Sequence, residues 1–188
     1  MTTTARIDYD VKCLKGYFQR LFELLREAVE ENRKAPTVAV DIDSIESQET
    51  FFHIDHLIKP NMLINISGLV DFWLKEVCNQ HKKTKNLNLG YNDIRGKNDL
   101  DVFQKYLKKV VGLDLDIVQN SYKQLDNLRI VRNKYIHSGG HVLDENEKAK
   151  LSAINGVSFA LSVILVDDSF ISDSIDHAKT YLFEAAKF

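Results

Sequence analysis

The chain has 188 residues, of which 44% are hydrophobic and 28% are charged, and its formal net charge is −2. This length predicts a single domain over residues 1–188 with a sizeable core. The composition excludes a disordered or fibrous chain, and the net charge excludes a protein that coats nucleic acid through a globally basic surface. Any contact with nucleic acid must therefore come from a local basic patch.

Two features of the sequence bear on where the protein is expected to reside. Residues 1–10 contain no hydrophobic signal core, and no apolar run approaches the ~20 residues that a membrane-spanning helix needs. The two cysteines, Cys13 and Cys78, do not make a disulfide framework and fit a reducing compartment. We therefore expect a cytoplasmic protein without a membrane partner.

Apolar residues recur at helical spacing along most of the chain, which predicts an all-α helical bundle of five to six helices. With only two prolines and eight glycines, few positions force a break. A linker over 37–42, rich in β-branched residues, can adopt an extended backbone. The predicted helical segments cover residues 7–33, 47–81 with a break at Pro60, 99–111, 114–137, 144–165 and 172–188.

The polar segment 81–97 contains two glycines and is predicted to be a loop. It is also the nearest thing to a local cationic patch, and the alternative interpretation is an ordinary solvated, mobile loop. Its basic residues are Lys82, Lys83, Lys85, Arg95 and Lys97.

Three further signals mark helix ends. Gly112 suits the left-handed backbone conformation that ends the segment 99–111, and Ser138-Gly139-Gly140 ends the segment 114–137. Asp144 and Glu147 have the spacing of a capping box, which predicts the start of a mostly apolar helix. That helix contains Leu151, Ile154, Val157, Leu161, Ile164 and Leu165.

The segment 114–137 breaks its own pattern. Its apolar arc is predicted to contain Leu125, Leu128, Val131, Tyr135 and Ile136. Arg132 falls inside this arc, although an unpaired guanidinium is costly to bury. Arg132 must therefore pair with a carboxylate, reach a cleft or enter a subunit interface, and Asp71 is a candidate partner.

A polar ladder lies beside the apolar arc and contains Asp126, Arg129, Asn133 and His137. Asp126 and Arg129 can pair, and Asn133 and His137 are one turn apart and can touch. The helix dipole favours a protonated imidazole at the C-terminal end. A histidine that titrates near neutrality and a fixed arginine are the usual partners for proton transfer and for a phosphate. The alternative is structural, with His137 bonding the terminal carbonyls as a helix cap.

The stretch LRIVRNKYIHSGG resembles the signature of the HEPN superfamily, in which an arginine followed by a polar residue precedes a histidine by a few positions. Arg132, Asn133 and His137 match that pattern. The resemblance covers roughly residues 62–137 in pattern, and the first and last helices only in type. It implies a small helical bundle that dimerises through the motif helices. Many members are metal-independent endoribonucleases of toxin–antitoxin, abortive-infection and other prokaryotic defence systems, whereas others only bind.

The resemblance also implies roles for individual residues. His137 would exchange a proton with a ribose 2′-OH or the leaving oxygen, Arg132 would hold the scissile phosphate, and Asn133 would orient His137 or bind the phosphate. Asp126, Arg129 and Asp71 would support this site, which a homodimer would complete. Family toxins that pair with a nucleotidyltransferase antitoxin carry a tyrosine where this chain has Gly139, so the chain departs from the pattern of those toxins. A cognate antitoxin or another defence partner is expected. The expected RNA-binding residues are Lys134, Lys82, Lys83 and Arg95.

Metal chemistry is the weaker interpretation. His53 with His56, and Cys78 with His81, have spacings that could ligate zinc, but they lie on either side of Pro60 and would have to fold together. His141 is an alternative contributor to the cleft, and an exposed loop position is the simpler interpretation. No cofactor and no metal ion are expected.

Overall fold

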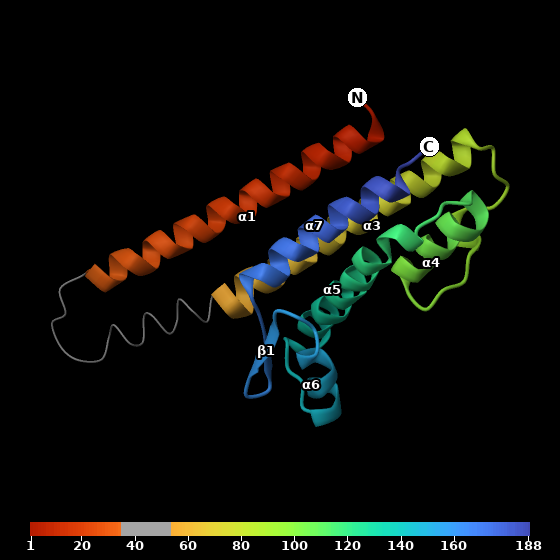
Figure 1. Ribbon diagram of the computed structural model, residues 1–188. Coiled ribbons are helices and arrows are strands. Elements are labelled where there is room, and N and C mark those ends of the chain that lie inside the picture. Colours follow the sequence, from red (N-terminus) through yellow and green to blue (C-terminus); the bar gives the residue numbers. More distant parts are fainter. Residues whose placement is uncertain (35–53) are drawn as a thin grey trace. The chain divides into compact units, whose positions relative to one another are not determined.

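The computed structural model describes residues 1–34 and 54–188 (Figure 1). The predicted all-α helical bundle is confirmed, because six α-helices and one small hairpin make up the regular structure of the described residues. The helices are α1 (Thr3–Lys34), α3 (Lys59–Thr84), α4 (Asp99–Tyr106), α5 (Gln119–Ser138), α6 (Glu145–Ser152) and α7 (Asp168–Ala185), and the strands are β1 (Val157–Ala160) and β2 (Val163–Val166). Short π-helical turns cover Ile54–Ile58 and Leu107–Val111, and 3-10 turns cover Tyr91–Asp93 and Asp116–Val118.

The local signals place several helix ends correctly. Pro60 lies in the first turn of α3, as predicted, but the π-helical turn Ile54–Ile58 leads directly into that helix, so the predicted break at Pro60 is not formed. Gly112 has φ +83° and ends the helical run that begins with α4, as predicted. Asp144 caps α6 by accepting hydrogen bonds from the backbone of Asn146 and Glu147. The predicted linker 37–42, the start of a helix near residue 47, and His53 lie outside the described residues.

The described chain divides into two compact units. The first contains Met1–Val11, Asn65–Ile130 and Asp173–Phe188, and the second contains the described parts of Lys12–Ile64 together with Val131–Ser172. Several helices therefore pass from one unit into the other. The prediction of a single domain over residues 1–188 stays a prediction.

In the first unit, the start of α1 packs against α3 around Trp73, which is 2% exposed. The indole Nε1 donates a hydrogen bond to Asp10 at 3.1 Å, and the guanidinium of Arg6 lies 5.4 Å from the ring centroid. Lys179 on α7 forms an ion pair with Asp8 on α1. An apolar centre with charged pairs at its edge thus joins three helices of this unit.

In the second unit, the start of α3 is tied to the hairpin. The Nζ atom of Lys59 donates to the carbonyl of Val166 at 2.9 Å and lies 3.4 Å from the carboxylate of Asp168. The side chain of Lys59 is only 12% exposed, so these contacts satisfy an ammonium group that is largely removed from water.

The hairpin corrects one prediction. The expected long helix from residue 144 ends at Ser152, and β1 and β2 pair antiparallel with Val157 opposite Val166 and Ala160 opposite Val163. Gly156 permits the turn into the hairpin, because it has φ +77° and an added Cβ would lie 2.9 Å from the side chain of Phe170. Burial in β2 then alternates from residue to residue, which is the period of a strand rather than of a helix.

The hairpin also changes the position expected for Leu161. A helix would have placed this residue on the buried face with its apolar neighbours. In the hairpin it occupies the two-residue turn with φ +57° and is 95% exposed.

The predicted loop 81–97 begins later than predicted, because α3 continues to Thr84 and carries Lys82 and Lys83 in its last turn. The part of the loop that follows α3 contacts α4 and the turn after α4. Lys85 donates to the carbonyl of Val111 at 2.8 Å, and Lys105 on α4 contacts the carbonyl of Arg95 at 3.4 Å. Tyr106 donates to the carbonyl of Leu89 at 3.3 Å. These contacts fix the loop to α4 and to the turn that follows it, within the first unit.

Candidate functional site

Helix α5 carries the residues that the sequence singled out. Four residues of the predicted apolar arc, Leu125, Leu128, Val131 and Tyr135, are at most 9% exposed, which confirms the arc. The fifth, Ile136, was predicted wrongly, because it is 49% exposed. Ile136 lies at the edge of the arc, where the buried side of α5 gives way to the polar ladder.

Arg132 lies half-buried on α5, as its place inside the arc predicted. Its Nη1 donates to the side-chain oxygen of Asn133 at 2.9 Å. The amide of Asn133 is therefore engaged with the arginine, and the expected contact between Asn133 and His137 is not formed. A neighbouring amide that accepts from the guanidinium restricts the rotation of the arginine side chain.

The polar ladder begins with the pair that the sequence predicted. Arg129 Nε donates to Asp126 at 2.8 Å in an ion pair that is about one-third exposed, which confirms this contact. These two residues belong to the first unit, and Val131 begins the part of α5 that belongs to the second. The ion pair and the Arg132–Asn133 bond are thus two separate arrangements on one helix.

The C-terminal end of α5 does not use His137 as a cap. Gly140 donates its backbone N–H to the carbonyl of Lys134 and Gly139 donates to that of Tyr135, both at 3.1 Å. The hydroxyl of Ser138 also donates to the carbonyl of Lys134 at 2.8 Å. Glycine amides and a serine therefore satisfy the terminal carbonyls.

His137 is exposed on the last turn of α5, and its imidazole makes no hydrogen bond or ion pair with any residue that the structure describes. It lies on the same helix as Arg132 and about one and a half turns further along. Both ring nitrogens of His137 are thus open to solvent. An accessible imidazole and a held guanidinium are the groups that proton transfer beside a phosphate requires.

The hairpin fixes the end of α5 through Tyr135. The Tyr135 hydroxyl donates to the carbonyl of Ile164 at 2.7 Å, and the backbone N–H of Ile164 donates to the carbonyl of Gly140 at 3.0 Å. Sequence reasoning missed this support because the run Val163–Val166 is apolar throughout and was assigned to a helix. Its β-branched residues were the available signal.

Other predicted site residues are placed as follows. Lys134 forms an ion pair with Glu147, so its charge is engaged inside the second unit. Asp71 is half-buried on α3 in the first unit, and its predicted pairing with Arg132 stays a prediction because the two residues belong to different units. Lys82, Lys83 and Arg95 also lie in the first unit, and His141 is exposed with its Nδ1 3.2 Å from the hydroxyl of Ser162.

The alternative of a zinc site concerns His53, His56, Cys78 and His81, of which His53 lies outside the described residues. Among residues 1–34 and 54–188, no three histidine, cysteine or acidic side chains gather closely enough to hold a metal ion. Cys78 and His81 are both buried, and the Nε2 atom of His81 lies 2.8 Å from the carbonyl of Ala185. In the same described residues, the helices lack the length of apolar sequence that a bilayer crossing needs.

Comparison with known proteins adds no assignment to this geometry. No protein-family model matches the sequence, and neither a curated protein nor a solved structure matches it.

Proposed function

We propose that this protein is a metal-independent endoribonuclease of the HEPN type, with Arg132, Asn133 and His137 at its centre. The observation that carries the proposal is the state of the two key groups on α5. Arg132 is half-buried and held by Asn133, while His137 is exposed and makes no bond with the described residues. A purely structural pair would be expected to bond each other or the helix end.

The chemistry assigns each residue a role. His137 removes the proton of a ribose 2′-OH or returns one to the leaving oxygen, and Arg132 stabilises the negative charge that develops on the scissile phosphate. Asn133 positions Arg132, because its oxygen accepts from the guanidinium at 2.9 Å. Attack by the neighbouring 2′-OH restricts the substrate to RNA.

A homodimer fits the same surface. Ile136 is 49% exposed between Arg132 and His137 in the sequence of α5, and an apolar side chain at that position suits contact with a second copy. Such a contact would bring two Arg132–His137 pairs into one cleft. A prokaryotic defence role, with a cognate antitoxin or another partner protein as inhibitor, belongs to the same proposal.

A second candidate is a HEPN-like module that binds RNA or a partner protein without cutting. The ion pair between Lys134 and Glu147 favours it, because that pair removes the basic charge closest in sequence to the motif. The net charge of −2 points the same way, since strong binding of a phosphate backbone needs several free cations.

The test is cleavage of RNA by the purified full chain in the presence of EDTA. Arg132→Ala and His137→Ala are each expected to slow cleavage by about a hundredfold or more. Arg20→Ala is the control, because the Arg20 side chain is 64% exposed on α1 and pairs with Glu23, three residues further along the same helix. Cleavage that both site variants retain in full would refute the catalytic proposal, and RNA binding without cleavage would favour the module.

A further inference from the structure

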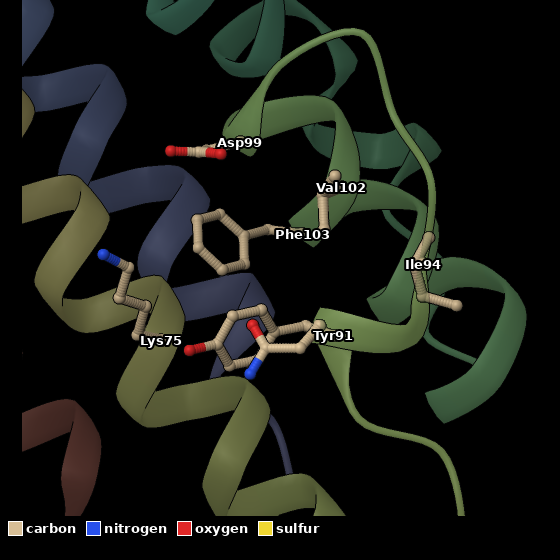
Figure 2. Close-up of a pocket in the computed structure, with 7 residues that line it drawn as sticks. Lys75, Tyr91, Ile94, Asp99, Val102 and Phe103 are labelled. Atoms are coloured by element: carbon tan, nitrogen blue, oxygen red, sulfur yellow. The ribbon is translucent and has the colours of Figure 1, made fainter.

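A pocket of about 390 Å³ lies in the first unit between α3 and the segment that leads into α4. Lys75 contributes to it from α3, Tyr91 from the loop, and Asp99 and Phe103 from α4. Figure 2 shows the Lys75 amine and the Asp99 carboxylate on the same side of the pocket, with the rings of Phe103 and Tyr91 beside them. Two opposite charges from different helices thus share one opening.

Both charges are available to a ligand. Neither the side chain of Lys75 nor that of Asp99 forms a hydrogen bond or an ion pair with any part of the chain that the structure describes. The neighbouring acids are engaged elsewhere: Asp93 accepts from the backbone of Gly90 at 2.8 Å, and Asp101 accepts from Lys105 at 2.8 Å. Asp99 is therefore the acid that remains for a bound molecule.

Apart from the two charged side chains, Asn92 adds an amide to the lining, and the other lining residues are aromatic or aliphatic. The centroids of the Tyr91 and Phe103 rings are 5.1 Å apart, and the ring planes are tilted by 53° to each other. Val102 and Ile94 add aliphatic surface to the lining. A volume of about 390 Å³ is at the small end for ligand pockets, so the pocket suits one compact small molecule rather than a peptide or an oligonucleotide.

We propose that this pocket binds a small zwitterion with an apolar or aromatic body, which is the chemistry of a free α-amino acid such as phenylalanine. The ammonium group of the ligand would face Asp99, its carboxylate would face Lys75, and its side chain would lie against Tyr91 and Val102. A nucleotide fits less well, because its phosphate would meet one lysine and also the carboxylate of Asp99. The proposal is independent of ribonuclease activity.

The experiment is a titration of the isotopically labelled full chain, followed through its backbone amide resonances by NMR. Three probes separate the contributions: L-phenylalanine carries both charges, 2-phenylethylamine lacks the carboxylate, and 3-phenylpropionate lacks the amine. We expect L-phenylalanine to shift amides around Tyr91 and Phe103 and to bind about tenfold more tightly than either analogue.

Two variants assign the charges. Lys75→Met is expected to weaken the binding of L-phenylalanine and 3-phenylpropionate about tenfold and to leave the binding of 2-phenylethylamine unchanged. Asp99→Asn is expected to weaken the binding of L-phenylalanine and 2-phenylethylamine about tenfold and to leave the binding of 3-phenylpropionate unchanged. Glu76→Gln and Lys109→Met are matched controls, because both residues are exposed, belong to the first unit and do not line the pocket. The controls should bind all three probes as the unaltered chain does.

Three results would overturn the proposal. The first is no shift of the pocket amides by L-phenylalanine at millimolar concentration. The second is an affinity for L-phenylalanine that neither Lys75→Met nor Asp99→Asn changes. The third is tighter binding of a nucleoside monophosphate at the same amides, which would assign the pocket to nucleotides instead.

Discussion

Replacing Gly140 with alanine is expected to destabilise the end of α5 more than the same change at Gly139. Both glycines have positive φ, +81° and +59°, so a side chain costs about 1–2 kcal/mol at either position. Only Gly140 has a close neighbour: an added Cβ would lie 2.8 and 2.9 Å from two carbons of the Tyr135 ring. At Gly139 the nearest atom is 3.9 Å away.

The Tyr135 ring cannot easily move aside, because its hydroxyl is bonded to Ile164 at 2.7 Å. Overpacking of this kind costs about 1–3 kcal/mol. Gly140→Ala should therefore lower the free energy of unfolding by about 2 kcal/mol more than Gly139→Ala. Urea denaturation of both variants measures the difference.

A double-mutant cycle identifies the source of this cost. In a Tyr135→Ala background the ring is absent, and the two alanine substitutions should become similar in their effect. Equal losses for Gly140→Ala and Gly139→Ala in the unaltered chain would refute the reasoning, because they would mean that the ring does not crowd Gly140.

Three further outcomes test other parts of the structure. Tyr135→Phe should cost about 1–2 kcal/mol in urea denaturation, because the carbonyl of Ile164 loses its side-chain donor; an unchanged midpoint would contradict this bond. Burial lowers the pKa of His81, so the unfolded chain takes up the proton more readily and stability falls as the pH drops through about 6.5. Thermal unfolding between about pH 7 and 5 should show that slope, and His81→Gln should flatten it. Burial also raises the pKa of Cys78 to about 12, so iodoacetamide at neutral pH should label the exposed Cys13 alone in the native chain, as peptide mass spectrometry would detect.

Local periodicity was sufficient to predict most of the helices and four of the five residues of the apolar arc of α5. Leu128 and Val131 are buried because their spacing aligns them on one side of a helix, and this spacing is visible in the sequence. Arg132 was found by the same reasoning, as a charged residue in an apolar position. The ion pair of Asp126 and Arg129 also follows from spacing alone.

Tertiary contacts decided what the sequence could not. The run around Ile164 suits a helix and a buried strand equally well, and in the structure it pairs with Val157–Ala160 as a hairpin. The glycine at position 156 permits the turn that leads into this hairpin, because a side chain there would meet Phe170. Asn133 can reach either Arg132 or His137 from its place on α5, and in the structure it bonds to Arg132. The pocket beside Lys75 brings together residues from separate elements, and no local pattern marks them.

The most direct test of the ribonuclease proposal compares two oligonucleotides in EDTA, an RNA that the protein cuts and the same RNA with a single 2′-deoxynucleotide at the cleavage site. The account predicts that the full chain cuts the first, leaves a 2′,3′-cyclic phosphate and spares the second, and that His137→Ala cuts neither at a comparable rate. Cleavage of the deoxy-substituted strand, or full activity of His137→Ala, would contradict it.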